Sequence, residues 1–460
     1  MRAKGAAGLA AFPDAGSPFD ARLRCGRLRT SFRRAMTLPG SPQIAYRGDR
    51  LFVEDCAVEE LVRRHGSPLY VYSRSSMLDA LSGYQRALSG RDHLICYAMK
   101  ANSNLAVLQL FVRAGCGFDI VSLGELERAL AAGAKANQVV FSGVGKQRKE
   151  MRHALEAGVL CFNVESESEL RVLSAVASEA GLTARISLRV NPDVDAGTHP
   201  YISTGLRNNK FGIPHQRAVE AYRLASILPG LEVVGIDCHI GSQITEVGPY
   251  LDALDRLLDL IEAVEAHGIP VPHIDLGGGL GIAYAGESPP TAEALMRALL
   301  ERIDARGYGH RKVLVEPGRS VVGNAGLLVS EVLFLKHAAD KSFCIVDAAM
   351  NDLMRPAMYD AWMDIVECRR RGDIEAARYD VVGPICESGD WLGRDRSLSV
   401  ESGDLLAVLS AGAYCMSMAS NYNSRGRAAE VLVSGGEAWL VREREDLKAL
   451  FSLERLLPSS

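Results

Sequence analysis

The sequence predicts a two-domain α/β protein, in which a (β/α)8 TIM barrel is joined to a mainly β, β-barrel-like C-terminal domain that also takes in an N-terminal strand. Three observations predict this fold. Between residues 75 and 328, short apolar runs rich in β-branched residues alternate with longer segments of helical periodicity, which is typical of βαβ units in a parallel sheet. Eight such repeats fill about 250 residues, the usual size of a closed barrel, and a doubly wound open sheet is the alternative. After residue 324 the helical pattern gives way to further strand-like runs.

The elements of the barrel follow one another along the chain. The expected strands are eight apolar runs, at 94–99, 118–121, 139–141, 159–164, 185–190, 233–239, 273–276 and 313–315. The expected helices lie between them, at 104–114, 123–132, 148–157, 167–180, 216–228, 250–267 and 291–305. In each of these longer segments the apolar residues recur at helical spacing, so one face of each helix can pack against the sheet.

The second domain is predicted from both ends of the chain. Strand-like runs lie at 327–335, 343–346, 379–382, 405–409, 430–433 and 439–441. Gly435-Gly436 separates the last two runs and resembles the two-residue turn of a β-hairpin. Together with a strand near residues 51–53, these runs assign 37–74 and 329–460 to the β domain and 75–328 to the barrel.

Composition excludes several classes of function. The 460 residues are 48% hydrophobic and 23% charged, which is typical of a globular chain of about two domains. A net charge of only −4 argues against a nucleic-acid or membrane partner, and no apolar run approaches the roughly 18 residues that a membrane span needs. The ten cysteines are dispersed without a CxxC pair, so we expect no metal site and a reduced, cytoplasmic protein.

Residues 1–36 differ from the rest of the chain. They hold eight Lys and Arg residues and only two acids, a bias that transit peptides share. We expect a disordered extension instead, because the segment has no apolar core region and no clear amphipathic repeat. A further alternative is an upstream start codon, with Met36 as the true beginning.

Polar residues cluster at the downstream ends of the predicted strands. In a (β/α)8 barrel those ends share one face, and that face carries the active site. An arrangement scattered by chance would not place candidates after every strand. The residues at these positions are Lys100, Asp119 with Ser122, Ser142, Glu165, Asn191, His239, Gly277 to Gly279 and Glu316.

Three of these features together suit pyridoxal 5'-phosphate (PLP) as a cofactor. Lys100 ends an apolar run, so we expect partial desolvation to depress its pKa and free its amine for carbonyl chemistry. Gly277 to Gly279 and the segment Glu316–Arg319 follow the seventh and eighth strands, where barrels commonly bind phosphate. Glu316 is the candidate acid for the ring nitrogen, and His239 could pack on the ring. Taken singly, each feature has a plain structural alternative: a solvent-facing lysine, a tight turn or a core histidine.

Longer motifs extend this interpretation to a family. They are YAMKAN at 97–102, GFDIVSLGEL at 117–126, FSGVGK at 141–146, THPYISTGLRNNKFGI at 198–213, HIGSQ at 239–243, DLGGGLG at 275–281, EPGRS at 316–320, RPAMYDA at 355–361, CESGD at 386–390 and GAY at 412–414. With these motifs the chain resembles the barrel-type, alanine-racemase-like, PLP-dependent amino-acid decarboxylases from about Gly66 to Leu456. Within that family the resemblance is closest to the branch that converts meso-2,6-diaminopimelate to L-lysine and CO2, the last step of lysine biosynthesis.

The resemblance implies a role for individual residues. The implied cofactor contacts are Lys100 as the lysine that binds PLP covalently, His239 on the ring, Ser242, Gly277, Gly278, Gly279, Glu316, Pro317, Gly318, Arg319 and Tyr414. The implied substrate contacts are Arg319, Arg355, Tyr359, Glu387 and Tyr414. The resemblance further implies that Cys386 donates a proton, with Lys100 and His239 as the other catalytic residues, and that a homodimer shares its active sites.

Two rival functions are set against this one. A sister decarboxylase would act on ornithine, arginine, lysine or a carboxylated polyamine, but such substrates lack a second carboxylate, so a distal pair of arginines would be out of place. A non-catalytic PLP-binding regulator would lack the lysine or the acid, whereas Lys100 and Cys386 are both present. Without the family resemblance, Arg355 could be a surface residue and Cys386 an apolar filler.

Overall fold

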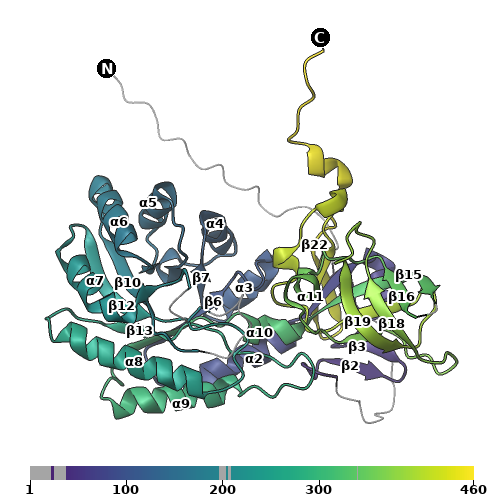
Figure 1. The fold of residues 1–460 in the computed structure, drawn as a ribbon, viewed down its shortest axis with the longest axis horizontal. Helices are drawn as coiled ribbons and strands as arrows, with labels where there is room; N and C mark the ends of the chain where they lie inside the picture. Colours follow the sequence, from purple (N-terminus) through teal and green to yellow (C-terminus); the bar gives the residue numbers. More distant parts are fainter. Residues whose placement is uncertain (1–21, 25–37, 196–203, 206–208, 339, 460) are drawn as a thin grey trace.

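The computed structural model describes residues 22–24, 38–195, 204–205, 209–338 and 340–459. A closed barrel of parallel strands lies beside a mainly β domain (Figure 1). The predicted disordered extension at 1–36 lies outside the described residues except for β1 (Arg22–Arg24), which pairs with β22 (Glu437–Arg442). Part of the motif at 198–213 also lies outside them. In the described part of the chain, no helix is long and apolar enough to cross a membrane.

The barrel has eight strands, as predicted. They are β6 (His93–Ala98), β7 (Gly117–Ile120), β8 (Val139–Phe141), β9 (Cys161–Val164), β10 (Ala184–Asn191), β12 (Leu231–Asp237), β13 (His273–Asp275) and β14 (Lys312–Val315). Neighbouring strands pair in parallel, and the ring closes where β14 pairs with β6 and β9 pairs with β10. The closed barrel is therefore confirmed over the open sheet, with small shifts at the strand ends.

Helices cover the outside of the barrel (Figure 1). They are α2 (Arg74–Leu88), α3 (Leu105–Arg113), α4 (Leu123–Ala131), α5 (Arg148–Ala157), α6 (Glu167–Ala180), α7 (His215–Ile227), α8 (Gly248–Glu265) and α9 (Ala292–Ala305). Several begin at a side-chain cap: Ser122 accepts from the N–H of Glu125 at 3.3 Å, and Ser166 accepts from that of Glu169 at 3.1 Å. Such caps satisfy backbone donors that the first turn leaves free, so each helix starts soon after the strand end that carries a polar residue.

The inside of the barrel changes from apolar to charged along its axis. One buried cluster, separate from the main core, contains Leu94, Cys96, Val140, Cys161 and Leu314. Near the carboxyl ends of the strands the buried side chains are instead Asp119, Asn163, Arg189, Asp237, Asp275 and Glu316. Barrels usually fill this space with branched apolar side chains. Buried charge in that layer therefore indicates a functional site.

The β domain is built from both ends of the chain. Its ten-stranded sheet contains β1, β22, β5 (Leu69–Ser73), β15 (Gly326–His337), β16 (Ser342–Val346), β17 (Ile365–Glu367), β18 (Ala377–Val382), β19 (Trp391–Leu398), β20 (Leu405–Val408) and β21 (Ala429–Ser434). The predicted hairpin is confirmed, because Ser434 of β21 lies opposite Glu437 of β22 and Gly435 has a φ of 56°. The exact domain boundaries remain a prediction.

The predicted N-terminal strand is β3 (Arg50–Val53), which pairs with β2 (Ile44–Arg47) and β4 (Cys56–Ala57) in a small sheet before α1 (Val58–His65). Leu51 and Val53 share a buried cluster with Leu327 and Val431 of the large sheet. Figure 1 shows the purple strands β2 and β3 beside the green and yellow strands of the β domain.

The cysteines follow the prediction with one exception. Eight described cysteines are free thiols, and all of these except Cys386 are buried. Cys56 is disulfide-bonded, so the prediction of a fully reduced chain is wrong at this residue.

The β domain supports the loop that carries Lys100. Asn104 caps α3 directly after that loop, and its Nδ2 donates to Oε2 of Glu430 on β21 at 3.0 Å. The hydroxyl of Tyr72 on β5 donates to the other Glu430 oxygen at 2.7 Å. The N–H of Tyr414 donates to the carbonyl of Ala101 at 2.8 Å. These hydrogen bonds fix a barrel loop from the neighbouring domain.

Replacing Glu430 by leucine should therefore destabilise the protein. The change removes the acceptor of the Tyr72 hydroxyl and leaves Nδ2 of Asn104 with only the carbonyl of Val441 at 3.4 Å. Each buried donor that loses its acceptor costs roughly 1–3 kcal/mol. We expect urea denaturation to show a loss of about 2–4 kcal/mol in the free energy of unfolding. Glu443→Leu, at an exposed position of the same strand region, is the control and should stay within about 0.5 kcal/mol of the parent. Equal stability of the two variants would contradict the role of Glu430.

Candidate active site

Lys100 lies in the turn that follows the first barrel strand and forms a short ion pair with a residue of the next strand. Its Nζ donates to Oδ2 of Asp119, on the next strand, at 2.5 Å. Burial alone would lower the pKa of the Lys100 amine, but the carboxylates of Asp119 and Glu316 outweigh it and raise the pKa above its ordinary value. The predicted depression of this pKa is therefore wrong, because the strand end that removes water also supplies anions.

The backbone of the glycine segment after β13 packs closely against the backbone that follows β12 and β14. A Cβ on Gly277 would lie 2.3 Å from the carbonyl oxygen of Cys238, and one on Gly279 would lie 2.4 Å from that of Gly241. Both glycines have positive φ, 64° and 103°, which side chains disfavour. The N–H of Glu316 donates to the carbonyl of Gly277 at 2.7 Å. The glycines thus let three loops of the barrel face meet without side chains between them.

His239 lies at the end of β12 as a neutral imidazole. The N–H of Gly278 donates to its Nδ1 at 3.1 Å, so this nitrogen carries no proton. Burial and the neighbouring cations Arg189 and Lys100 lower the pKa of His239 well below its ordinary value. The ring is therefore held in one tautomer next to the glycine segment, where it can stack on a flat ligand.

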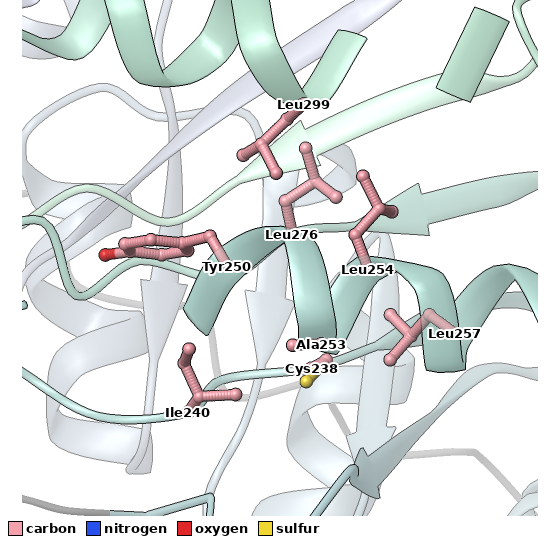
Figure 2. Close-up of a pocket in the computed structure, with 8 residues that line it drawn as sticks. All are labelled: Cys238, Ile240, Tyr250, Ala253, Leu254, Leu257, Leu276 and Leu299. Carbon is pink, nitrogen blue, oxygen red and sulfur yellow. The ribbon is translucent and has the colours of Figure 1, made fainter. Parts of the chain in front are cut away.

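The opposite side of the same strand end is closed. Cys238 and Ile240 alternate with His239 and help to line a small cavity of about 20 Å³. Figure 2 shows that Tyr250, Leu254, Leu276 and Leu299 complete its walls, with Leu254 and Tyr250 on the helix that covers the strand. The cavity is apolar and small, so it belongs to the core behind the site. The hydroxyl of Tyr250 also donates to the carbonyl of Gly278 at 3.3 Å and supports the glycine segment from behind.

Three buried carboxyl groups lie together near the carboxyl ends of the barrel strands. Asp237, Asp275 and Glu316 each offer an oxygen within 4.8 Å of the others, a spacing that a metal ion could also use. Burial and the carboxylates of Asp119 and Asp275 raise the pKa of Glu316 well above its ordinary value, and burial raises the pKa of Asp275 to about 7. Buried carboxylates this close cannot all ionise, so the cluster holds protons near neutral pH.

Sequence reasoning missed Asp237, Asp275 and Arg189 as part of this layer. Arg189 lies 3.3 Å from Glu165 and 3.9 Å from Asp237. The available signal was a charged residue within or at the end of an apolar strand, which is rarely buried without a partner. The predicted strand-end residues Asp119 and Glu165 do lie in the layer.

A second part of the site holds two arginines. The Nη2 of Arg319 donates to Oγ of Ser242 at 3.0 Å, and its guanidinium lies 4.8 Å from the ring centroid of Tyr414. Arg355, at the start of α11 (Met354–Tyr359) in the β domain, lies 4.5 Å from the ring of Tyr284. The structure thus brings together Ser242, Arg319, Arg355 and Tyr414 as predicted, and adds Tyr284, which the sequence did not single out.

The remaining predicted residues lie elsewhere in the β domain. Cys386 and Glu387 are exposed. The N–H of Cys386 donates to Oδ1 of Asn423 at 3.3 Å, and Glu387 accepts a hydrogen bond from Tyr422. Tyr359 ends α11 and is half-buried. Within the described residues, the chain presents Cys386 and Glu387 to its surface.

Comparison with known proteins gives this geometry a family. The model of the pyridoxal-dependent decarboxylase family, pyridoxal binding domain, matches residues 74–323. The diaminopimelate decarboxylase of Vibrio cholerae is 55% identical over 411 residues, which cover 89% of this chain and 97% of that protein. The chain belongs to the diaminopimelate decarboxylase family.

Solved structures of the diaminopimelate decarboxylase family share the fold. The enzyme of M. jannaschii in co-complex with L-lysine superimposes with a TM-score of 0.87 at 37% identity, covering 92% of this chain and 99% of that chain. The enzyme of Helicobacter pylori complexed with L-lysine gives a TM-score of 0.82 at 40% identity, covering 86% and 98%. The protein is therefore an enzyme, a carboxy-lyase that uses PLP.

The residues of this site fit PLP. Gly277 and Gly279 pack so closely against neighbouring backbone that no side chain fits at either position, and such glycine segments can turn their N–H groups toward a phosphate. Lys100 offers an amine beside Asp119, Glu316 offers a buried acid whose backbone N–H donates to the glycine segment, and the neutral ring of His239 accepts a hydrogen bond from that segment. One face of the barrel therefore supplies an amine, an acid and a flat ring, the three kinds of group that suit PLP.

The raised pKa of Asp275 predicts a pH dependence of stability. Because the folded-state pKa of about 7 lies above the ordinary 3.8, the folded protein holds a proton that the unfolded chain releases. The free energy of unfolding of the cofactor-free protein should therefore fall as the pH rises from about 4 to about 7. Asp275→Asn cannot ionise, so it should lose much of this fall in urea unfolding at pH 5 and pH 8. Asp252→Asn, at an exposed position, should keep it; an unchanged profile in Asp275→Asn would contradict the assignment.

Proposed function

We propose that this enzyme decarboxylates meso-2,6-diaminopimelate to L-lysine and CO2, the last step of lysine biosynthesis. One observation carries the proposal: Arg319 and Arg355 are both buried, each residue being 6% exposed. In the described part of the chain, no carboxylate lies within the 4.0 Å of an ion pair from either guanidinium group. A buried charge without a counter-ion is costly. A ligand that brings its own carboxylate would compensate it.

The charge of the site favours a dicarboxylic substrate over its rivals. Ornithine, arginine and lysine end in a cation, which two buried guanidinium groups would repel. A second carboxylate would instead meet planar donors that bind it in a bidentate manner. Two relatives have been solved with L-lysine, which supports a product that keeps one carboxylate.

The residues of this chain divide the work. Bound PLP supplies an electron sink for the electron pair that remains when CO2 leaves. Lys100 would hold the cofactor through its amine, and Glu316, whose buried carboxyl has a raised pKa, would face the ring nitrogen. The neutral His239 ring covers one face of the cofactor and excludes water. Gly277 to Gly279, Ser242 and the segment Glu316–Arg319 would hold the cofactor, with Glu316 at the ring nitrogen and the glycines at the phosphate.

The substrate end is assigned to the β domain and its neighbours. Arg319, Arg355, Tyr359 and Tyr414 bind the substrate beside the cofactor. Cys386 donates the proton to the carbon that has lost CO2, and Glu387 accepts the distal ammonium. A side chain that transfers a proton in this way typically accelerates a reaction by about 10²–10⁴-fold.

Purified protein loaded with PLP should release CO2 from meso-diaminopimelate and not from ornithine. The reason is the uncompensated pair of arginines, and CO2 release with each substrate is the measurement. Borohydride should fix the cofactor to the peptide that contains Lys100. Lys149→Ala is a matched lysine control for the label, since Lys149 lies at an exposed position of α5. Release from ornithine alone would establish the sister activity, and label on another peptide would move the cofactor away from Lys100.

We further propose a cytoplasmic homodimer that shares its active sites. Cys386 and Glu387 are exposed within one chain, whereas their roles require contact with the substrate at the barrel face. A partner subunit related by two-fold symmetry would insert this loop into the other site, and the exchange would occur twice. Eight described cysteines are free thiols and one, Cys56, is in a disulfide, a balance that favours a reducing compartment.

Mixing two inactive variants should restore activity if the site is shared. Lys100→Ala and Cys386→Ala should each lose at least about 10²-fold in rate. In a mixed dimer one site carries both substitutions, and the other combines an intact Lys100 with an intact Cys386 from its partner. Up to half of the sites in each mixed dimer should therefore recover, measured as CO2 release after subunit exchange. Mixed dimers that form without recovery would mean that each site is built within one chain.

A further inference from the structure

Tyr284 lies between the two arginines of the site. The Nη1 of Arg319 donates to its hydroxyl at 2.5 Å. The guanidinium of Arg355 lies 4.5 Å from the centroid of the same ring, and that of Arg319 lies 5.9 Å from it. Tyr284 is 4% exposed. One aromatic ring therefore contacts a cation from the barrel and a cation from the β domain.

The loop that carries Tyr284 is held along its backbone. Gln243 accepts from the N–H of Ile282 at 3.2 Å and donates to its carbonyl at 2.6 Å. Asn324 donates to the carbonyl of Ala283 at 2.9 Å. Oε2 of Glu287 accepts from the N–H of Tyr284 at 2.9 Å. The ring thus occupies a position set by barrel residues on both sides of the loop.

The two guanidinium groups keep donors for a ligand. Arg319 uses Nη1 on Tyr284 and Nη2 on Ser242, and its buried Nε has no partner among the described residues. Arg355 makes one weak contact, from Nη1 to Sδ of Met363 at 3.9 Å. Two buried cations repel each other, and an electron-rich group between them offsets part of that repulsion. The face of an aromatic ring and a hydroxyl oxygen are both electron-rich groups of this kind.

We propose that Tyr284 is a positioning residue that sets substrate specificity, because it joins Arg319 and Arg355 into one site for the distal carboxylate of the substrate. This inference rests on the proposed function and adds to it the residue that holds the arginines together. The hydroxyl orients Arg319, and the ring face offsets the charge of Arg355. Without Tyr284 the arginines would keep their charge but lose their common geometry.

Two small molecules isolate the distal carboxylate. Decarboxylation of the meso compound to L-lysine removes the carboxylate of the D centre, so L-lysine retains the distal carboxylate of the L centre. 1,5-Diaminopentane has the same chain and both amines but no carboxylate. Neither molecule can lose that reacting carboxylate, so both can be titrated into the holoenzyme by calorimetry. The dissociation constant of 1,5-diaminopentane divided by that of L-lysine measures what the distal carboxylate contributes to binding.

Tyr284→Leu should lower this ratio by about 10- to 100-fold, the usual effect of losing a hydrogen bond to a charged group. The loss should come from weaker binding of L-lysine, with 1,5-diaminopentane unchanged. Tyr284→Phe keeps the ring and should show a smaller decrease, which also covers the case in which Tyr284→Leu does not fold. Tyr308→Leu removes another tyrosine that lies 4.8 Å from an arginine, Arg311, outside the site, and should leave the ratio unchanged.

The possible results separate the two proposals. A parent enzyme that releases no CO2 from meso-diaminopimelate and does not prefer L-lysine would overturn the proposed function and this inference with it. A parent enzyme that does both, with an unchanged ratio in Tyr284→Leu and Tyr284→Phe, would overturn this inference alone. Weaker binding of PLP with an unchanged ratio would assign Tyr284 to the phosphate through Arg319, and would equally overturn it.

Discussion

The architecture of the site depends on charge buried inside the barrel. A closed ring of parallel strands points the residues at its carboxyl ends at one another, and here those residues include Asp119, Asp237, Asp275 and Glu316. Lys100 and Arg189 are the cations that face them. An excess of carboxyl groups in so little water keeps some of them protonated. The barrel thereby holds protons among carboxyl groups that interact with the Lys100 amine.

Much of the fold could be predicted because its signals are local. Apolar runs alternating with helical segments identify all eight barrel strands, and Gly435-Gly436 identifies the hairpin of β21 and β22. The strand β19 was missed because Arg394, Asp395 and Arg396 interrupt its apolar pattern. Arg396 is nevertheless buried, and its guanidinium lies over the ring of Trp362. A neighbour distant in sequence supplies the environment that the pattern lacks.

The site was predictable in its residue types and less so in its electrostatics. Motifs locate Lys100, His239, the glycine segment and Glu316, and the structure brings these together. The direction of the Lys100 pKa was not predictable, because it depends on Asp119, which approaches only when two strands pair. Tyr284 was missed because its contacts with Arg319 and Arg355 form only in the folded chain, and the sequence of its own loop does not indicate them.

Glu430 supports the Lys100 loop from outside the segment that the family model matches, so the sequence-defined domain and the structurally supported unit differ. The segment that matches the cofactor-binding family, 74–323, contains every strand of the barrel. The acceptor for Asn104 and the donor to Ala101 lie outside it, at Glu430 and Tyr414. The segment that the family model matches therefore contains the whole barrel but not all of the residues that support the barrel's Lys100 loop. Insertions or exchanges near residues 74 and 323 would remove these hydrogen bonds from the loop that carries Lys100, although every strand of the barrel would remain.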